Sequence, residues 1–334
     1  MLETNNSKIY EVSASPHSIK PETIKSVMFD VLIALIPAVI AAFVFFRWSA
    51  VYVMGLTILF CVGFEYIFSK LLLKKNTVSD LSCVVTGLLL AMNLPSNVPW
   101  WIMLVGSFFS IVIGKLVFGG IGQNPFNPAL VGRVVLLVSW PAILTTWPKP
   151  QLIKSVSDIF RNIDSITSAT PLGILKEKGV SYLSSSTPHF LYSDLYFGYC
   201  GGSLGEISAF ALIIGGIYLL YKGHITLHIP LSFIISVLII SGIFWFTDNS
   251  KFADPLFHIL SGGVMLGAIF MATDMVTTPL TVSGMIIFGT GCGIITMMIR
   301  IFGAYPEGVS FSILIMNALT PLIDRYTKPR RYGI

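Results

Sequence analysis

The sequence predicts an all-α integral membrane protein, and three observations support this fold class. Hydrophobic residues make up 54% of the 334-residue chain and charged residues only 11%, against about 25% charged residues in ordinary soluble domains. The mean hydropathy is +0.81. Apolar runs near the roughly 20 residues that a bilayer-crossing helix needs recur along the chain. This much apolar surface does not fit inside one water-soluble core, so we expect lipid to be the main solvent.

The apolar runs define about ten predicted membrane-spanning helices. Segments 81–94 and 256–272 are short, and their backbone groups would stay unpaired if they faced lipid, so we place both inside the bundle, as broken helices. A polar stretch, 148–205, separates the two sets. The predicted spans are 27–46, 50–73, 81–94, 98–118 and 128–147, then 206–221, 226–247, 256–272, 282–302 and 308–323.

The two short segments also resemble each other, which indicates an internal duplication. Residues 87–93 align with 267–273, and Phe118-Gly119 aligns with Phe302-Gly303. Two repeats of five spans each force the second repeat to be inverted relative to the first. The predicted organisation is an N-terminal segment (1–26), a first five-helix repeat (27–147), a loop (148–205), a second five-helix repeat (206–323) and a basic tail (324–334).

The distribution of Lys and Arg predicts the orientation in the membrane. With both termini in the cytoplasm, the short outer loops receive only Arg47, Lys251 and Arg300, as the positive-inside rule requires. This places 148–205 outside the cytoplasm in a bacterial or archaeal cell (inner) membrane. The net charge of +5 lies mainly in short flanking segments, which argues against nucleic-acid binding.

Neither cysteine nor histidine spacing favours a metal site. Cys61, Cys83, Cys200 and Cys292 lie far apart without a CxxC pair, so a disulfide framework, a zinc site and a self-contained iron–sulfur cluster are not expected. The histidines show no ligand spacing.

The outer stretch contains Ser168-Ala169-Thr170-Pro171-Leu172. The simplest interpretation is a Ser/Thr-rich surface loop whose hydroxyl groups cap a short helix. The alternative is a threonine hydroxyl that accepts a phosphoryl-linked group, with Ala169 leaving space and Pro171 restricting the backbone.

Acidic residues at membrane depth are costly and usually functional. Asp80 and Asp274 hold related positions in the two predicted repeats, and Asp324 follows the last span. These three are candidates for an ion pathway. Lys115 and Arg133 either pair with Asp80 and Asp274 or extend their charged ends to the membrane interface. The alternative for the aspartates is that they cap helices at the membrane interface or are surface charges.

Two further features lie near the predicted cytoplasmic side. Glu65 lies within the second span with Lys70 near it. Residues 119–133 join two spans and offer the amide groups of Asn124 and Asn127. Either these amides satisfy free helix ends in a tight turn, or they line a ligand site or an ion path.

Several motifs in this order resemble the flavin-carrying membrane subunits of two complexes, and the resemblance covers essentially the whole chain. The complexes are the sodium-pumping NADH:quinone reductase (B subunit) and the Rnf complex (D subunit). The chain lacks the longer N-terminal extension of the former and looks more like the latter. The motifs are the 119–133 block, Ser168-Ala-Thr-Pro-Leu172, Gly201-Gly-Ser-Leu-Gly-Glu206, Phe270-Met-Ala-Thr-Asp274, Tyr305-Pro-Glu-Gly308, Met316-Asn317 and Pro321-Leu-Ile-Asp324.

The resemblance implies cofactors at named positions. In that family a threonine in an S/G-x-A-T context carries FMN through a phosphoester bond, and the matching position here is Thr170. Ser168 and Ala169 supply its context, although many relatives have glycine where Ser168 stands. Family members have also been assigned a non-covalent riboflavin, for which Asn124 and Asn127 are candidate lining residues.

The resemblance also implies a function and partners. The chain is expected to relay electrons inside an Rnf-type complex, a translocase that couples electron transfer between ferredoxin and NAD to movement of Na⁺ or H⁺. Nothing in the sequence resembles a dinucleotide fold or a Cys-ligated cluster, so the subunit is not expected to oxidise ferredoxin or NADH itself, and no catalytic residue is expected in it. Expected partners are an FMN-bearing G-type subunit, membrane A- and E-type subunits and a flavin transferase. The alternatives are the quinone-reductase B subunit and a urea-channel-like solute transporter.

Overall fold

The computed structural model is helical throughout the part of the chain that it describes, which confirms the predicted all-α class. No strand occurs in these ranges. The described residues are 23–74, 77–150, 170–180 and 192–328.

The first helical element is longer than a membrane is thick and is divided by a sharp break. Helix α1 (Ile24–Phe68) begins at Thr23, whose side chain accepts a hydrogen bond from Ser26 N, and contains non-helical backbone at Arg47, with φ 57° and ψ −136°. Its 45 residues would extend about 68 Å at 1.5 Å per residue, twice the apolar thickness of a bilayer. The break therefore lies where the sequence predicts a loop between two spans, and a π-helix, η1 (Ser69–Leu73), continues the second part.

The remaining helices of the first half lie mostly within the predicted spans, but the predicted span 128–147 is divided at Trp140, whose backbone is not helical. Helix α2 is buried over nearly its whole length and packs against α1, α3 and α4, in agreement with its predicted place inside the bundle. It is one continuous helix, so the prediction that this segment is broken is wrong. The elements are η2 (Val78–Asp80), α2 (Ser82–Met92), α3 (Trp100–Phe108), η3 (Phe109–Ile113), η4 (Leu116–Phe118), α4 (Pro128–Ser139) and α5 (Pro141–Leu144).

The second half contains a helix with one break, which is followed by a π-helical turn. Between α11 and α12 the backbone is non-helical around Ser261, and a π-helix, η6, follows α12 directly; the residues of α12 and η6 are buried. This is the segment predicted to be a broken helix inside the bundle. The elements are α6 (Pro171–Lys178), α8 (Tyr192–Phe197), α9 (Ala209–Lys222), α10 (His228–Thr247), α11 (Pro255–Leu260), α12 (Val264–Leu266), η6 (Gly267–Met271), α13 (Val282–Phe302) and α14 (Val309–Tyr326).

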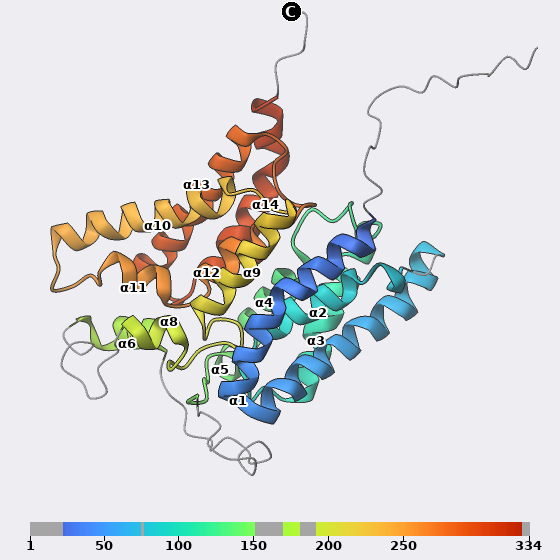
Figure 1. Cartoon of the computed structure of the whole chain (residues 1–334), viewed down its shortest axis with the longest axis horizontal. Helices are drawn as coiled ribbons and strands as arrows, with labels where there is room; N and C mark the ends of the chain where they lie inside the picture. Colours follow the sequence, from blue (N-terminus) through green and yellow to red (C-terminus); the bar gives the residue numbers. More distant parts are fainter. Residues whose placement is uncertain (1–22, 75–76, 151–169, 181–191, 329–334) are drawn as a thin grey trace, which may run out of the picture.

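The arrangement in space separates two sides of the helical body. Figure 1 shows α6 and α8 on one side, opposite the start of α1 and the end of α14. Among the described residues, four helical segments are long and apolar enough to cross a membrane, and α2, α4 and α9 are shorter apolar helices. The four long segments are Ile24–Leu73, Trp100–Phe118, His228–Thr247 and Val282–Phe302.

Candidate functional site

Thr170 begins α6 and caps its N-terminus. Its Oγ1 accepts a hydrogen bond from Gly173 N at 3.0 Å, and Pro171 occupies the first helical position, where its missing N–H costs nothing. The Thr170 residue is 7% exposed. The structure thus shows the helix cap that the sequence predicts as its simpler interpretation, and it leaves the hydroxyl oxygen at a helix end. Ser168 and Ala169 lie outside the described residues.

Lys176 ties α6 to a distant loop. Its Nζ donates to the carbonyl oxygens of Gly303 and Tyr305. Partial burial lowers the pKa of Lys176 from its ordinary value. Helix α6 is therefore held against the segment that joins α13 to α14.

Thr170 lines a cavity with an empty volume of about 350 Å³, which we call the Thr170 site. The cavity brings together α6, the loop before α9 and the break between α11 and α12. It is lined by Thr170, Pro171, Leu172, Leu195, Cys200, Gly201, Gly202, Glu206, Ile207, Leu260, Ser261, Gly262 and Glu307.

Two carboxyl groups of this cavity come from motifs that are 101 positions apart. Glu206 and Glu307 lie within hydrogen-bonding reach of each other, and Arg133 Nη2 lies 3.7 Å from Glu307 Oε2. In the sequence the two glutamates stand out only as parts of family motifs, and Arg133 as the end of the 119–133 block and as a partner for the aspartates. The prediction that Arg133 pairs with Asp80 or Asp274 is wrong, because its carboxylate neighbour is Glu307.

A second guanidinium group binds the free carbonyl groups at the break between α11 and α12. Arg300 Nη1 donates to His258 O at 2.6 Å, and Nη2 donates to Ser261 O at 3.0 Å. Gly262 has φ +69°, and a Cβ there would lie 2.9 Å from Arg300 Nη2. Arg300 is a buried residue of α13, which corrects its assignment to an outer loop.

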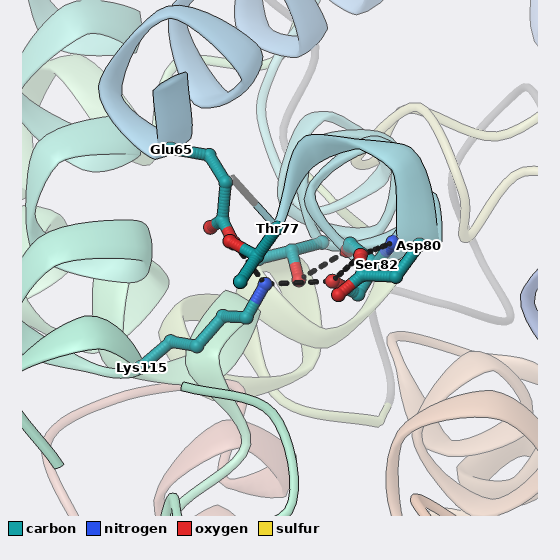
Figure 2. Close-up of polar contacts among 6 residues, drawn as sticks. Glu65, Thr77, Asp80, Ser82 and Lys115 are labelled. Carbon is teal, nitrogen blue, oxygen red and sulfur yellow. Dashed lines mark hydrogen bonds and ion pairs between the residues drawn. The ribbon is translucent and has the colours of Figure 1, made fainter. Parts of the chain in front are cut away.

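A buried ion pair lies elsewhere, among α1, η2, α2 and the end of η3. Lys115 Nζ lies 2.8 Å from Glu65 Oε1, and the two side chains are 2% and 0% exposed. Lys115 Nζ also donates to Ser82 Oγ at 2.6 Å, and Ser82 Oγ donates to Asp80 Oδ1 at 2.5 Å. Figure 2 shows Glu65 and Ser82 on different sides of the ammonium group. With Thr77, which donates to Glu65 Oε1, we call these residues the Lys115 network.

The partners in this network differ from those predicted. Lys70, the predicted neighbour of Glu65, instead donates to Tyr66 Oη at 2.6 Å. Lys115 reaches Asp80 only through Ser82, so a direct ion pair between Lys115 and Asp80 is wrong. Spacing along one helix identifies Lys70, whereas the true partner lies 50 positions away, and no local pattern reveals it.

Lys115 and Ser82 also line a second cavity, which we call the Asn124 cavity. Its empty volume is about 820 Å³. Its wall is mainly apolar, with a few polar and charged groups. It is lined by Val27, Met28, Val31, Ser82, Val85, Thr86, Leu89, Lys115, Ile121, Asn124, Asn127, Pro128, Ala129, Leu219, His224, Ile225, Phe270, Thr273, Asp274, Met275 and Val276.

The two candidate asparagines have different contacts. Asn127 caps α4, since its Oδ1 accepts from Ala129 N and Leu130 N, and its Nδ2 donates to Met271 O at 3.2 Å. Asn124 Nδ2 donates to Phe126 O at 3.0 Å. Both residues line the cavity, but the amide of Asn127 is already engaged with helix ends.

The three candidate aspartates do not converge. Asp274 lines the Asn124 cavity and accepts from Val276 N and Thr277 Oγ1. Asp80 accepts from Ser82 at the start of α2. Asp324 lies on α14 and accepts from Leu280 N at 3.1 Å. Asp80 and Asp274 therefore approach the same cavity, one through Ser82, whereas Asp324 binds a neighbouring loop.

One buried acid has no counterpart among the residues singled out from the sequence. Asp30 Oδ2 lies 2.7 Å from His224 Nε2, and Asp30 Oδ1 accepts from Tyr218 Oη at 2.8 Å. His224 lines the Asn124 cavity. Asp30 lies in an apolar run, where an ionised side chain is energetically costly, and this feature of the sequence could have identified it.

Comparisons with known proteins show the family of the chain. Residues 11–333 match the model of the NQR2, RnfD, RnfE family. The chain is 46% identical over 326 residues to the D subunit of the Na⁺-translocating ferredoxin:NAD⁺ oxidoreductase complex of Acetobacterium woodii, a match that covers 97% of this chain and 95% of that protein. It is 44% identical over 327 residues to the D subunit of the proton-translocating ferredoxin:NAD⁺ oxidoreductase complex of Clostridium ljungdahlii, with 97% and 96% covered.

A more distant relative carries the same kind of name. The D subunit of the ion-translocating oxidoreductase complex of Pectobacterium atrosepticum is 35% identical over 350 residues, with 97% of this chain and 99% of that protein covered. The family model spans nearly the whole chain, and apolar helices fill the described part. This multi-pass membrane protein belongs to the NQR2, RnfD, RnfE family.

Proposed function

We propose that the chain is the D-type membrane subunit of an Rnf complex, in which it relays electrons during ion-coupled transfer between ferredoxin and NAD⁺. The names of three relatives that match over nearly their full length support this assignment over the quinone-reductase subunit and the solute channel. The partners in this proposal are a G-type flavoprotein subunit, A- and E-type membrane subunits and a flavin transferase.

The observation that carries the electron-relay proposal is the position of Thr170. Its Oγ1 lies at the N-terminus of α6, beside a cavity lined by Gly201, Gly202 and Gly262. A phosphoester on this oxygen would lie where helix N–H groups and the helix dipole favour an anion. Residues at the site therefore fit FMN attached through phosphate, and the flavin supplies one-electron chemistry when bound.

Charged groups in and around the Thr170 site fix its backbone and line the space in which the flavin would lie. Arg300 fixes the backbone at the α11–α12 break through two carbonyl groups. Glu206 and Glu307 also line the cavity, next to Arg133. The protein's contribution is thus a glycine-lined space with fixed dipoles and a nearby carboxyl pair.

The Asn124 cavity is our candidate for the second, non-covalent flavin, in the form of riboflavin. Its apolar wall, which includes Leu89 and Phe270, suits a planar ring, and Asn124 and Lys115 offer polar contacts at its edge. Because Asp80 and Asp274 approach this cavity, we assign the ion pathway to its surroundings, with Asp324 in a supporting position on α14.

Ten spans in two inverted five-helix repeats, with cytoplasmic termini, remain our proposed topology. The distribution of Lys and Arg supports it, as does the position of α6 opposite the start of α1 and the end of α14 (Figure 1). In this orientation the Thr170 site lies on the extracytoplasmic side and the Asn124 cavity on the cytoplasmic side.

In-gel ultraviolet fluorescence of the denatured chain, made together with a flavin transferase, tests the attachment. We expect a fluorescent band for the wild type and none for Thr170→Ala. Thr170→Asn is the matched control, since asparagine preserves the N-cap but offers no hydroxyl to esterify. It should fold like the wild type and lack the label. A labelled Thr170→Asn chain, or an unlabelled wild type, would refute the proposal.

A further inference from the structure

The proposed function gives Lys115 a polar contact at the edge of the Asn124 cavity, but it leaves the buried ion pair between Lys115 and Glu65 without a role. Its side chains are 0% and 2% exposed, and a charge taken out of water costs several kcal/mol even after relaxation. Replacement by apolar residues is often neutral or stabilising for such pairs. Ionisable groups at membrane depth are accordingly a sign of function.

The pair is not fully satisfied by the protein. Glu65 Oε2 is buried, and no hydrogen-bond partner for it occurs among the described residues. Lys115 has three N–H donors, of which one is given to Glu65 and one to Ser82. The third donor has no acceptor in the described part of the chain, so the ammonium group retains capacity for a ligand.

Lys115 is placed between its counter-ion and the Asn124 cavity. Among the described residues that line this cavity, it is the single lysine or arginine. Ser82, its second partner, lines the same cavity, whereas Glu65 does not. The positive member of the pair is therefore nearer to any occupant than the negative member.

From this geometry we infer that Lys115 stabilises negative charge on an electron-carrying occupant of the Asn124 cavity, with Glu65 as the counter-ion that tunes this effect. The inference rests on the proposed second flavin. Each electron that arrives from a neighbouring redox centre of the complex adds one negative charge to the cavity, and no bond forms or breaks in the protein. An ammonium group at short range in a low-dielectric site favours the reduced, more negative form. Lys115 thus acts as a positioning and tuning residue.

Redox titration of the full chain, purified in detergent, tests the inference. Acid precipitation first separates non-covalent flavin from flavin that stays on the polypeptide, and the midpoint potential of the non-covalent flavin is then measured spectroscopically. Lys115→Met should lower the preference for the reduced form about tenfold, which is about 59 mV for a one-electron couple. Glu65→Gln should raise the potential, because the remaining ammonium is no longer compensated. Lys70→Met, near the same helix end but exposed, is the control and should change nothing.

The Glu65→Gln/Lys115→Met double variant keeps the test decisive if a single variant fails to fold. Its potential should lie below the wild type and above Lys115→Met. A purely structural pair would leave the potential unchanged in every variant that still binds flavin, and this result would overturn the inference alone. A wild-type chain that binds no acid-released flavin would overturn the proposed occupant together with the inference, while the Thr170 label would be unaffected.

Discussion

A buried cation lies at the wall of the Asn124 cavity and another lies behind the broken helix that lines the Thr170 site; the two hold comparable places in the sequence but have different partners. Lys115 lies three positions before Phe118-Gly119, and Arg300 lies two positions before Phe302-Gly303. Lys115 faces a carboxylate, whereas Arg300 donates to two backbone carbonyl groups. The Lys115 ammonium group can bind a second anion beside its carboxylate partner. The Arg300 guanidinium group is fixed by two carbonyl groups of the backbone, which keep their positions as long as the break is folded. The comparison suggests an adjustable site and a rigid site.

The carboxyl groups of the two regions also differ in the number of charged neighbours. In the Thr170 site, Glu206 and Glu307 lie against each other with Arg133 beside them. In the Lys115 network the only close cation of Glu65 is Lys115, within the part of the chain that is described. Loss of one charge should therefore disturb the second region more strongly.

The largest expected effect is that of Glu65→Gln on stability. The variant leaves the Lys115 ammonium buried without a counter-charge, which costs about 3–5 kcal/mol when a buried pair is broken from one side. Glu65→Leu/Lys115→Met should recover most of this loss, because both charges are removed. Thermal unfolding in detergent measures the difference. If the single and double variants were equally destabilised, the pair would not be the adjustable element of the comparison.

A smaller loss is expected for Arg300→Met in the rigid site. It removes two donors from His258 O and Ser261 O; each hydrogen bond to a charged group contributes about 1.5–3 kcal/mol, and only the bond to His258 O should be lost in full. Ser261 lines the cavity, so water can replace part of the lost contact. Thermal unfolding and the yield of Thr170-linked flavin should fall together. Arg300→Lys, which keeps the charge but not the two-pronged geometry, should give an intermediate value. Unchanged unfolding would show that Arg300 does not fix the break.

Whether a feature of this structure can be predicted from the sequence depends on how far apart in the sequence the interacting residues lie. Thr170 and Pro171 form a cap and a first helical position within four residues of Gly173, and such local chemistry is visible in a single sequence. The helix boundaries are also local, which is why the apolar runs coincide with most helices. Gly262 and Gly263 indicate the break in segment 256–272, since glycine accepts the positive φ found at Gly262.

The contacts between helices are not predictable in the same way. A soluble helix reveals its packing face by an apolar stripe, but in α10 the apolar residues are spread almost evenly around the helix. Charged residues are then the only distinctive groups, and their neighbours on the same helix attract attention first. This is why the sequence points to Lys70 as the neighbour of Glu65, and why the approach of Glu206 to Glu307 needs the structure.

The smallest expected effect separates the two asparagines of the adjustable site. Asn127→Ala removes the N-cap of α4 and should cost about 1 kcal/mol, with little loss of non-covalent flavin, because its amide is already bonded to the protein on both sides. Asn124→Ala loses only a bond to Phe126 and should change stability less but weaken flavin binding, since the Asn124 carboxamide oxygen has no acceptor role among the described contacts. Unfolding temperature and acid-released flavin, measured on the same preparations, distinguish the two effects. If Asn127→Ala lost flavin without loss of stability, the roles assigned to the two residues would be reversed, and the cavity wall would contain a ligand group where the structure shows a helix cap.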